Sequence, residues 1–412
     1  MVSGVRRVVL LAAVLAGCLL VCVGASAQLV LGQYEDEAPL GTWNIFGSPP
    51  APAVGLGGAQ LARSWDASVS LANPALLSSL PRLSASLSAS YGRASLFRYA
   101  LVNTGVVESS GNLPVGLFGA DSAAVAARFG PWALAFVAAA PESYGRPRID
   151  IAGQGYRLTF DQTGLLRVFH AGVARRLPGG WSAGLGLNYA AGRLDRTTVD
   201  MTTDPSGTIT ITDDKSERYH GFFLNAGLAW EATPRLIVAL AGRSPYLKKG
   251  SASSLLRYEA ATDIRIEAEA VNSYRQPWVV GAGASYRLSP AWSLAADAAF
   301  FGWSGYRATF FDEPLVRPFR NVVRAGGGVE YLAPAGMYGR AARIPFRLGF
   351  SVDPQPVTSV RSTYLALTFG TGLQLRALAV DISASYGRES GSGRALKVGR
   401  IVLSVRYETD ER

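Results

Sequence analysis

The sequence predicts an all-β fold: a membrane-spanning antiparallel β-barrel of about 14 strands, closed from inside by an N-terminal plug, or hatch. Three observations predict this class. Apolar and polar residues alternate with period two in segment after segment, the links between these segments alternate between short and long, and no long apolar run follows the N-terminal segment of this apolar chain.

The composition is apolar for a chain of 412 residues, with 49% hydrophobic and only 17% charged residues. Ordinary soluble domains contain about 25% charged residues, and a spanning helix needs roughly 20 consecutive apolar residues. No run of that length follows the N-terminal segment, so the chain either buries a large soluble core or faces lipid as strands. The net charge of +10 comes from dispersed basic residues. That dispersion argues against nucleic acid and, in an exported protein, favours outer-membrane lipid as the counterpart.

The first 27 residues have the pattern of an export signal. Arg6 and Arg7 supply the positive region, residues 8–23 the apolar region, and residues 25–27 a small-residue cleavage site. We therefore expect residues 1–27 to be a signal peptide and the protein to reach the bacterial outer membrane. The alternative is a lipoprotein, because residues 15–18 resemble a lipidation box with Cys18 as the modified residue.

Neither the cysteines nor the histidines predict a metal or a cofactor. Both cysteines, Cys18 and Cys22, lie in the signal segment, so the mature chain would have no disulfides and no thiolate ligands. His170 and His220 fall in different predicted strands, without further ligands at metal-binding spacing. Neither lies in a serine-containing motif. We expect no metal, no cofactor and no enzymatic activity, with an outer-membrane lipase kept as a third hypothesis.

The period-two alternation is clear in residues 181–192, where Trp181 and Tyr189 share one face and Ser182 and Asn188 share the other. Lipid-facing strands have this pattern, and because backbone polar groups must be paired in lipid, such strands close into a barrel. The predicted strands are 83–92, 123–130, 132–140, 165–176, 181–192, 218–230, 235–243, 275–287, 291–302, 321–331, 344–353, 362–374, 377–387 and 398–407.

The links between these strands support the same topology. Short links such as 130–131 and 289–290 alternate with long ones, namely 93–122, 141–164, 193–217, 244–274 and 303–320. Outer-membrane barrels alternate short periplasmic turns with long external loops. Link 332–343 breaks this order because it should be short, and residues 263–271 are expected to extend a strand above the membrane. The last strand ends near Tyr407, which resembles the signal that barrel-assembly machinery reads.

Residues 28–82 do not alternate and are rich in Gly, Pro, Ala and Ser. We expect them to form the plug, and residues 83–412 to form the barrel. Within the plug, the segment GLGGAQLARSWDASVSLANPALLSSLP (55–81) resembles the hatch of FadL-type transporters of long-chain fatty acids and aromatic hydrocarbons. Residues 276–303, 323–353 and 364–386 are also similar to this family. The residues that match the hatch motif are Gly57, Gly58, Asp66, Asn73, Pro74 and Ala75.

The resemblance implies passive transport of hydrophobic molecules, with long-chain fatty acids as the leading cargo. The ligand would bind in the lumen, pass the hatch and leave sideways through the barrel wall. A shared fold supports architecture more than cargo. A docking or structural barrel without transport, either a secretion accessory or a surface antigen, is therefore the alternative.

Individual residues have competing interpretations. Asn73 is expected to hydrogen-bond to the inner barrel wall and Pro74 to fix a bend, although Asn-Pro also begins ordinary turns. Asp297 and Asp381 fall on inward faces of strands and are expected to pair with inward arginines. The basic run 243–249 is expected in a solvated external loop, with lipid phosphates or a ligand carboxylate as other partners. Candidate ligand contacts, which could equally be plug packing, are Phe46, Leu76, Leu77 and Leu80.

Overall fold

The computed structural model describes residues 49–103, 106–143, 146–153, 155–205, 207–259, 263–310, 313–315, 318–337, 340–356, 358, 361–391 and 397–409. The expected signal peptide with Cys18, and the candidate ligand contact Phe46, lie outside the described residues. In the described part of the chain, no helix combines the length and the apolar character that crossing a membrane as a helix requires.

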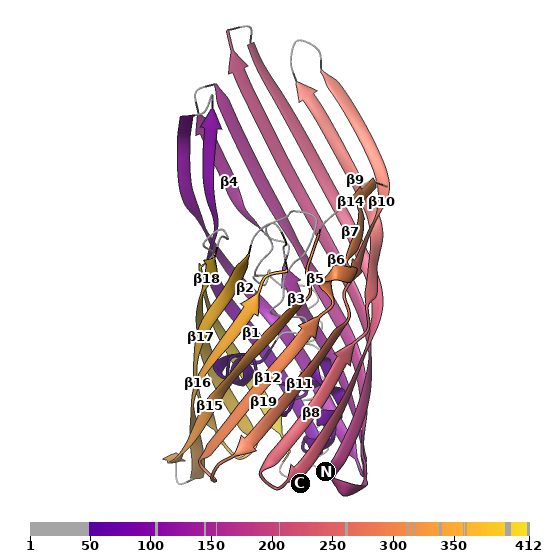
Figure 1. The fold of residues 1–412 in the computed structure, drawn as a ribbon, viewed down its shortest axis with the longest axis vertical. Helices are drawn as coiled ribbons and strands as arrows, with labels where there is room; N and C mark the ends of the chain where they lie inside the picture. The colour runs from indigo at the N-terminus through magenta and orange to yellow at the C-terminus, as the bar shows by residue number, and fades with distance from the viewer. Residues whose placement is uncertain are drawn as a thin grey trace, which may run out of the picture.

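Fourteen antiparallel strands form a closed ring, which confirms the predicted fold class and strand number. The first strand closes the ring by pairing with the last, from Ser84↔Glu408 to Ser95↔Lys397. The ring strands are β1 (Leu83–Asn103), β2 (Val106–Phe129), β3 (Trp132–Ser143), β5 (Tyr156–Arg176), β6 (Trp181–Asp204), β7 (Gly207–Thr233), β8 (Leu236–Arg243), β11 (Val279–Arg287), β12 (Trp292–Phe301), β15 (Val322–Met337), β16 (Arg340–Pro354), β17 (Ser362–Gln374), β18 (Leu378–Gly391) and β19 (Lys397–Glu408). Figure 1 shows them tilted around a common axis.

The alternation seen in the sequence separates the two faces of the wall. Along β18, Val380 and Ile382 are exposed outside, whereas Asp381 and Ser383 are buried inside. Aromatic pairs mark both edges of the outer apolar surface. Trp181 stacks on Trp230 at the turn end, with ring centroids 5.3 Å apart. At the other end, Tyr189 packs on Phe222 at 4.9 Å.

These aromatic pairs set the height of the apolar band. Trp181 and Tyr189 lie eight residues apart on β6, as do Phe222 and Trp230 on β7, which is about 26 Å along a strand. Trp292 and Phe300 of β12 repeat this spacing and pack on Tyr331 and Trp278. At the roughly 35–45° tilt of barrel strands this length rises about 20 Å along the barrel axis, comparable to the roughly 25 Å apolar band of outer-membrane barrels.

The sheet continues beyond the ring at the end opposite the short turns (Figure 1). The predicted loop 193–217 was wrong, because β6 and β7 stay paired up to Asp204↔Gly207. The predicted loop 244–274 was also wrong, and the strand expected at 263–271 is present as part of β10. The additional strands are β4 (Arg146–Gly153), β9 (Tyr246–Glu259), β10 (Ile264–Gln276), β13 (Arg307–Phe310) and β14 (Glu313–Leu315). Only β10 was predicted, from residues 263–271, and the other four strands lie within links that were expected to be loops.

Link 332–343, which broke the predicted alternation, is largely strand. β15 and β16 stay paired to Met337↔Arg340, which leaves only residues 338–339 between them. The turn is therefore short, as the topology requires.

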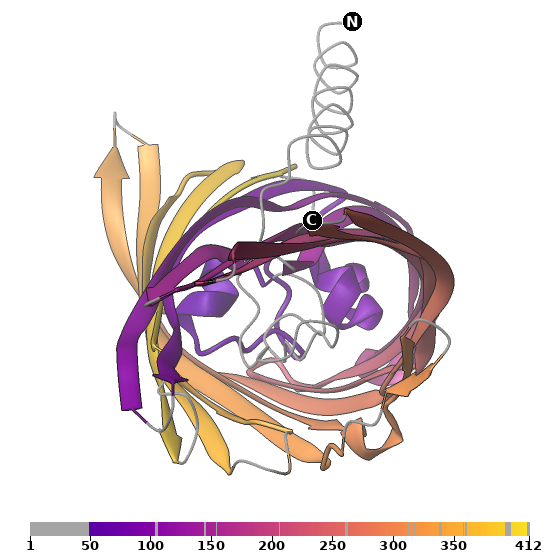
Figure 2. The ribbon, with the colours of Figure 1, turned by 90° about the horizontal axis from the view of Figure 1, so that it is seen from above.

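Residues 49–82 lie inside the ring, where Figure 2 shows their short helices surrounded by strands. They form α2 (Ala51–Gly55), α3 (Val69–Ala72) and the 3-10 helix η1 (Pro74–Ser79). Below, this described segment is called the plug. Its helices are short because glycines, an Asn-Pro step and serines interrupt every apolar run.

Candidate functional site

The Asn73-Pro74-Ala75 segment rests on a glycine seat in the wall, made by Gly184 of β6 and Gly227 of β7. These glycines face each other across the ladder. A Cβ on Gly227 would lie 1.8 Å from Asn73 Oδ1, and a Cβ on Gly184 would lie 2.5 Å from the Pro74 carbonyl carbon. Only glycine allows the plug backbone to approach this closely.

Among the described residues, the Asn73 side chain hydrogen-bonds within the plug and not to the wall, so that expectation was wrong. Its Nδ2 donates to the Leu61 carbonyl at 2.8 Å, and its Oδ1 accepts from the Ala75 amide at 3.1 Å. Asn73 thus caps η1 and ties two plug segments together, with Pro74 at the first position of η1. Shape complementarity to the glycine seat, and not a hydrogen bond, places the motif on the wall.

The glycine pair lies on the opposite side of the lumen. Gly57 and Gly58 have φ angles of 66° and 86°, a region that strongly favours glycine. The Gly57 amide donates to Thr368 Oγ1 at 3.0 Å. A Cβ on Gly57 would lie only 2.2 Å from the Phe350 carbonyl oxygen. The pair therefore makes a tight turn against β15, β16 and β17.

Asp66 organises the plug internally. It is buried and accepts hydrogen bonds from the Ser68 amide at 2.8 Å and the Ser68 hydroxyl at 2.6 Å. Burial raises the pKa of Asp66, and the hydrogen bonds from Ser68 oppose that shift. This carboxylate starts the turn that leads into α3.

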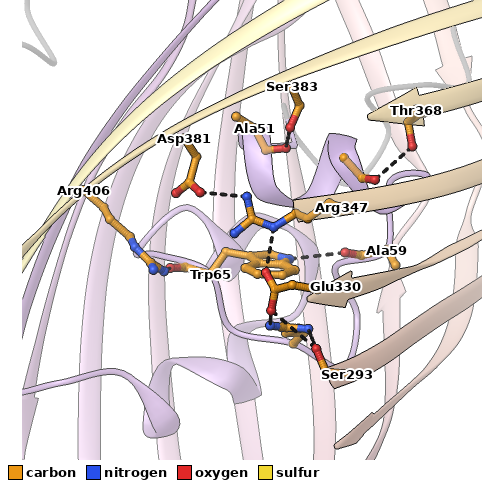
Figure 3. A network of polar contacts seen from close by, with 12 residues as sticks. Ala51, Ala59, Trp65, Ser293, Glu330, Arg347, Thr368, Asp381, Ser383 and Arg406 are labelled. Atoms are coloured by element: carbon orange, nitrogen blue, oxygen red, sulfur yellow. Dashed lines mark hydrogen bonds and ion pairs between the residues drawn. The ribbon is translucent and has the colours of Figure 1, made fainter. Parts of the chain in front are cut away.

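A buried ionic network joins the plug to the barrel (Figure 3). Arg347 of β16 donates through Nε to Glu330 at 2.7 Å and through Nη1 to Asp381 at 2.7 Å. The plug residue Arg63 forms a second ion pair with Glu330. The Trp65 ring lies beside both guanidinium groups, 4.1 Å from Arg63 and 5.3 Å from Arg347. The predicted pairing of Asp381 with an inward arginine is confirmed.

Asp297 has a different role from the predicted ion pair. Its Oδ2 accepts from two plug amides, Gln60 at 2.5 Å and Leu61 at 2.8 Å. The predicted arginine partner is therefore replaced by plug backbone. Local alternation could show that Asp297 faces inward, but not that a plug amide would reach it.

The structure brings Ser70 to His170, a contact that sequence reasoning missed. Ser70 Oγ lies 2.6 Å from His170 Nε2, and His170 Nδ1 lies 2.9 Å from Asn188 Oδ1. Asn225 donates to the carbonyls of Ser70 and Leu71 at 2.9 and 3.0 Å. A serine hydrogen-bonded to a histidine that a third side chain orients recurs in acyl-transfer enzymes. Here Ser70 is wholly buried against the wall, and we interpret the group as a latch that holds α3.

His220 lies apart from this latch, exposed on the outer face of the wall. Among the described residues, no group of three or more His, Cys, Asp or Glu side chains has the arrangement of a metal site. The three plug leucines that were candidate ligand contacts are buried: Leu76, Leu77 and Leu80. They lie in one apolar cluster with wall alanines such as Ala126 and Ala174.

The same apolar cluster continues from the plug to an aromatic group farther along the lumen. We call this group the upper aromatic cluster. Phe223 packs on Tyr246 at 4.6 Å and Tyr306 on Phe319 at 5.1 Å. The link 303–320, expected outside, thus sends side chains into the lumen. The members are Tyr219, Phe223, Tyr246, Tyr274, Phe301, Trp303, Tyr306 and Phe319.

Two cations lie within this cluster. Arg243 is 5.4 Å from the Tyr246 ring, and Lys248 is 5.9 Å from the Tyr219 ring and 3.4 Å from Glu142. Both cations are buried, which corrects the prediction of a solvated basic loop at 243–249. Burial lowers the pKa of Lys248, and the neighbouring Glu142 opposes that shift. The apolar surroundings with two cations have the chemistry of a site for an amphiphilic acid.

Hydrogen bonding in the wall changes between β2 and β3. Their ladder runs from Phe129↔Trp132 to Ser122↔Ala139, and among the described residues no β2–β3 pair continues beyond it. Residues 130–131 are a turn, as predicted.

Both strands carry an extra residue at the height where this ladder ends. β2 bulges against β1 at Asp121, and β3 bulges against β5 next to Pro141. Proline cannot donate to a ladder, and the Asp121 side chain turns inward to Arg400 at 2.8 Å. The wall is therefore discontinuous at the β2–β3 junction, a position that sequence alone did not locate.

Solved structures were found that share this architecture. The crystal structure of a Pseudomonas aeruginosa FadL homologue superposes with a TM-score of 0.66, at 15% identity, over 88% of this chain and 99% of that one. The fold is similar to that of a FadL homologue. The Ralstonia pickettii toluene transporter TbuX gives 0.61 at 14% identity, over 89% of this chain and 100% of that chain. The Pseudomonas putida toluene transporter TodX gives 0.63 at 14% identity, over 90% and 100%.

The TM-scores establish a FadL-like fold, whereas sequence identities this low do not establish a shared cargo. The resemblance to FadL-type transporters is thereby confirmed as a likeness of fold. No protein-family model matches the sequence, and no curated protein sequence matches it either.

Proposed function

We propose that this barrel is a bacterial outer-membrane channel for hydrophobic molecules and that long-chain fatty acids are its leading cargo. The observation that carries the proposal is the upper aromatic cluster with Arg243 and Lys248 buried in it. Aromatic rings can bind an acyl chain, while the two cations hold a carboxylate out of water. A neutral hydrocarbon would use the rings and have no need of the cations.

The proposed route of the ligand leads from the upper aromatic cluster to the plug and then to the β2–β3 junction. A ligand bound at the upper aromatic cluster reaches the plug through the apolar surface that joins Phe301 to Leu61 and Leu77. The plug leucines Leu76, Leu77 and Leu80 are the proposed ligand contacts there. The discontinuity between β2 and β3 is the proposed lateral exit, because unpaired strand edges can separate without breaking a ladder.

The plug is the proposed gate. It is tied to one side of the wall by ion pairs and to the other by the Ser70–His170 latch and the glycine seat. A ligand that displaces the plug leucines must weaken one of these attachments. The hatch motif shapes the plug so that the attachments on both sides of the wall can form. Its residues are Gly57, Gly58, Asp66, Asn73, Pro74 and Ala75.

The cargo proposal predicts a selective effect of the double variant Arg243→Gln/Lys248→Gln. Uptake of a labelled long-chain fatty acid, in cells lacking their own transporter, should fall about tenfold or more, because hydrogen bonds to charged groups contribute about 1.5–3 kcal/mol each. Uptake of a neutral hydrocarbon by the same cells should change less than about twofold, an effect well below one such bond.

Two controls make this measurement specific. Heat-shifted gel mobility establishes that the variant barrel is folded. Arg257→Gln/Arg265→Gln removes two exposed charges far from the lumen, whose ion pairs are with Asp214 and Glu267, and should leave uptake unchanged. Equal loss of both cargoes in the lumen variant would contradict a carboxylate site, and uptake of hydrocarbon alone by the native protein would assign a neutral cargo.

The docking alternative is favoured by the sheet above the ring. Residues 264–271 of β10 pair with β9 on one side, and among the described residues they have no strand on the other. Such edges accept an extended peptide. A folded barrel that takes up neither cargo, and that purifies with a stoichiometric protein partner, would support this function instead of transport.

A further inference from the structure

Basic side chains gather on the outer face of the wall where β5, β6, β7, β9 and β10 leave the apolar band. Arg193, Arg218, Lys249 and Arg275 are exposed, and Arg167 is half-buried. Their chain neighbours Leu194, Tyr219, Lys248 and Tyr274 are buried in the lumen, which places these cations outside. We call this group the basic band, and its members are Arg167, Arg193, Arg218, Lys249, Arg275 and Arg307.

The pairing register puts like charges directly opposite each other. Arg193 faces Arg218 across β6 and β7, and Arg275 faces Arg307 across β10 and β13. Directly opposed like charges have Cβ atoms about 5 Å apart and destabilise a sheet. A chain that folds with two such pairs in one region needs anions to neutralise them.

The protein itself supplies few of these anions. Arg193 forms an ion pair with Asp195 at 2.6 Å. Among the ion pairs of the described residues, none involves Arg218, Lys249 or Arg275. The neighbouring carboxylate Glu217 is buried in the lumen and accepts from Tyr274 at 3.0 Å. The charge of the band is therefore compensated in part, at Arg193, whereas the charges of Arg218, Lys249 and Arg275 face outward without such an ion pair.

The position of the band relative to the membrane indicates the source of the anions. The row Phe169↔Tyr189↔Phe222 forms the upper aromatic edge of the apolar band. The next outward-facing row above it contains Arg167 and His220. The row after that contains Arg193 and Arg218. Head groups of the outer leaflet lie at this height in an outer-membrane barrel.

We propose that the basic band binds the phosphorylated head group of lipid A, the glycolipid of the outer leaflet. Its phosphates would lie between the opposed arginines, where one anion relieves two repulsions and accepts bidentate hydrogen bonds. Its acyl chains would lie on Phe169, Tyr189 and Phe222. The proposal depends on the outer-membrane location and is independent of any transport activity.

The chain offers a matched control pair. Arg257 and Arg265 also face each other, across β9 and β10. Each of them, however, has its own carboxylate: Arg257 pairs with Asp214 at 2.5 Å, and Arg265 with Glu267 at 2.6 Å. This pair lies farther from the apolar band. Arg257→Gln/Arg265→Gln therefore removes the same charge as Arg193→Gln/Arg218→Gln without touching the basic band.

The test is to titrate the full-length barrel, purified in non-ionic detergent, with bis-phosphorylated lipid A and to count bound lipid by native mass spectrometry. We expect stoichiometric binding to the native protein, at least tenfold weaker binding to Arg193→Gln/Arg218→Gln, and binding within twofold of native for the control pair. Equal weakening in both double variants would reduce the effect to net charge and overturn the site. Equally tight binding of phosphatidylglycerol would overturn lipid A as the partner.

Thermal unfolding gives an independent readout with a distinctive sign. Without lipid A, Arg193→Gln/Arg218→Gln should unfold at the same temperature as the native protein or higher, because a repulsion is removed. With lipid A, the native protein should gain stability and the variant should gain little. A gain as large in the variant as in the native protein would contradict the proposal.

Discussion

Replacing Gly227 by alanine should unseat the plug and make cells permeable to solutes that the barrel normally excludes. The new Cβ would lie 1.8 Å from Asn73 Oδ1 and 2.8 Å from Asn73 Cγ, so the motif has to move away from the wall. Because Asn73 also holds the Leu61 carbonyl and caps η1, the displacement spreads through the plug. Overpacking of this kind costs about 1–3 kcal/mol. The measurement is entry of a large hydrophilic antibiotic, which should rise several-fold.

A glycine nearby provides the control for this prediction. At Gly242 of β8, an added Cβ would meet its nearest atoms at 3.5 and 3.8 Å, which is ordinary contact. Gly242→Ala should therefore leave permeability unchanged, while Gly184→Ala, on the other half of the glycine seat, should reproduce the effect of Gly227→Ala. Unchanged antibiotic entry in both glycine-seat variants would show that the ionic network alone holds the plug in place.

Replacing Arg347 by methionine should give the largest loss of stability among single substitutions in the ionic network. Arg347 is wholly buried and holds Glu330 and Asp381 at once. Without it, two carboxylates remain buried with less compensation, and breaking a buried pair in this way costs about 3–5 kcal/mol. The free energy of unfolding, measured with denaturant in detergent, should fall by that amount.

Two further variants test whether buried charge causes the loss of stability in Arg347→Met. Arg176→Met breaks an exposed ion pair with Glu231, whose side chains are 51% and 44% exposed, and should cost no more than about 1 kcal/mol. Adding Asp381→Asn to Arg347→Met, which leaves the Arg63–Glu330 ion pair in place, should recover most of the lost stability. A similar loss for Arg347→Met and Arg176→Met would contradict a role for burial.

Several parts of this protein follow from sequence alone. Period-two alternation in segments such as 181–192 and 377–387 located the membrane strands, because lipid on one face and the lumen on the other require opposite side chains at successive positions. The spacing of short and long links predicted the ring, and the absence of alternation before residue 83 set the plug segment apart. The inward orientation of Asp297 and Asp381 followed from the same local rule.

Only the tertiary structure decided what the inward side chains contact. Asp297 binds the amides of Gln60 and Leu61, Ser70 reaches His170, and the hatch motif rests on Gly184 and Gly227. These partners lie about a hundred or more residues apart, and no local pattern records them. The burial of Arg243 and Lys248, and the like-charge pairs outside the wall, depend in turn on how polar strands continue above the membrane. A polar residue such as Lys248 is buried there, so pairing between strands, and not side-chain polarity, determines which side chains enter the lumen.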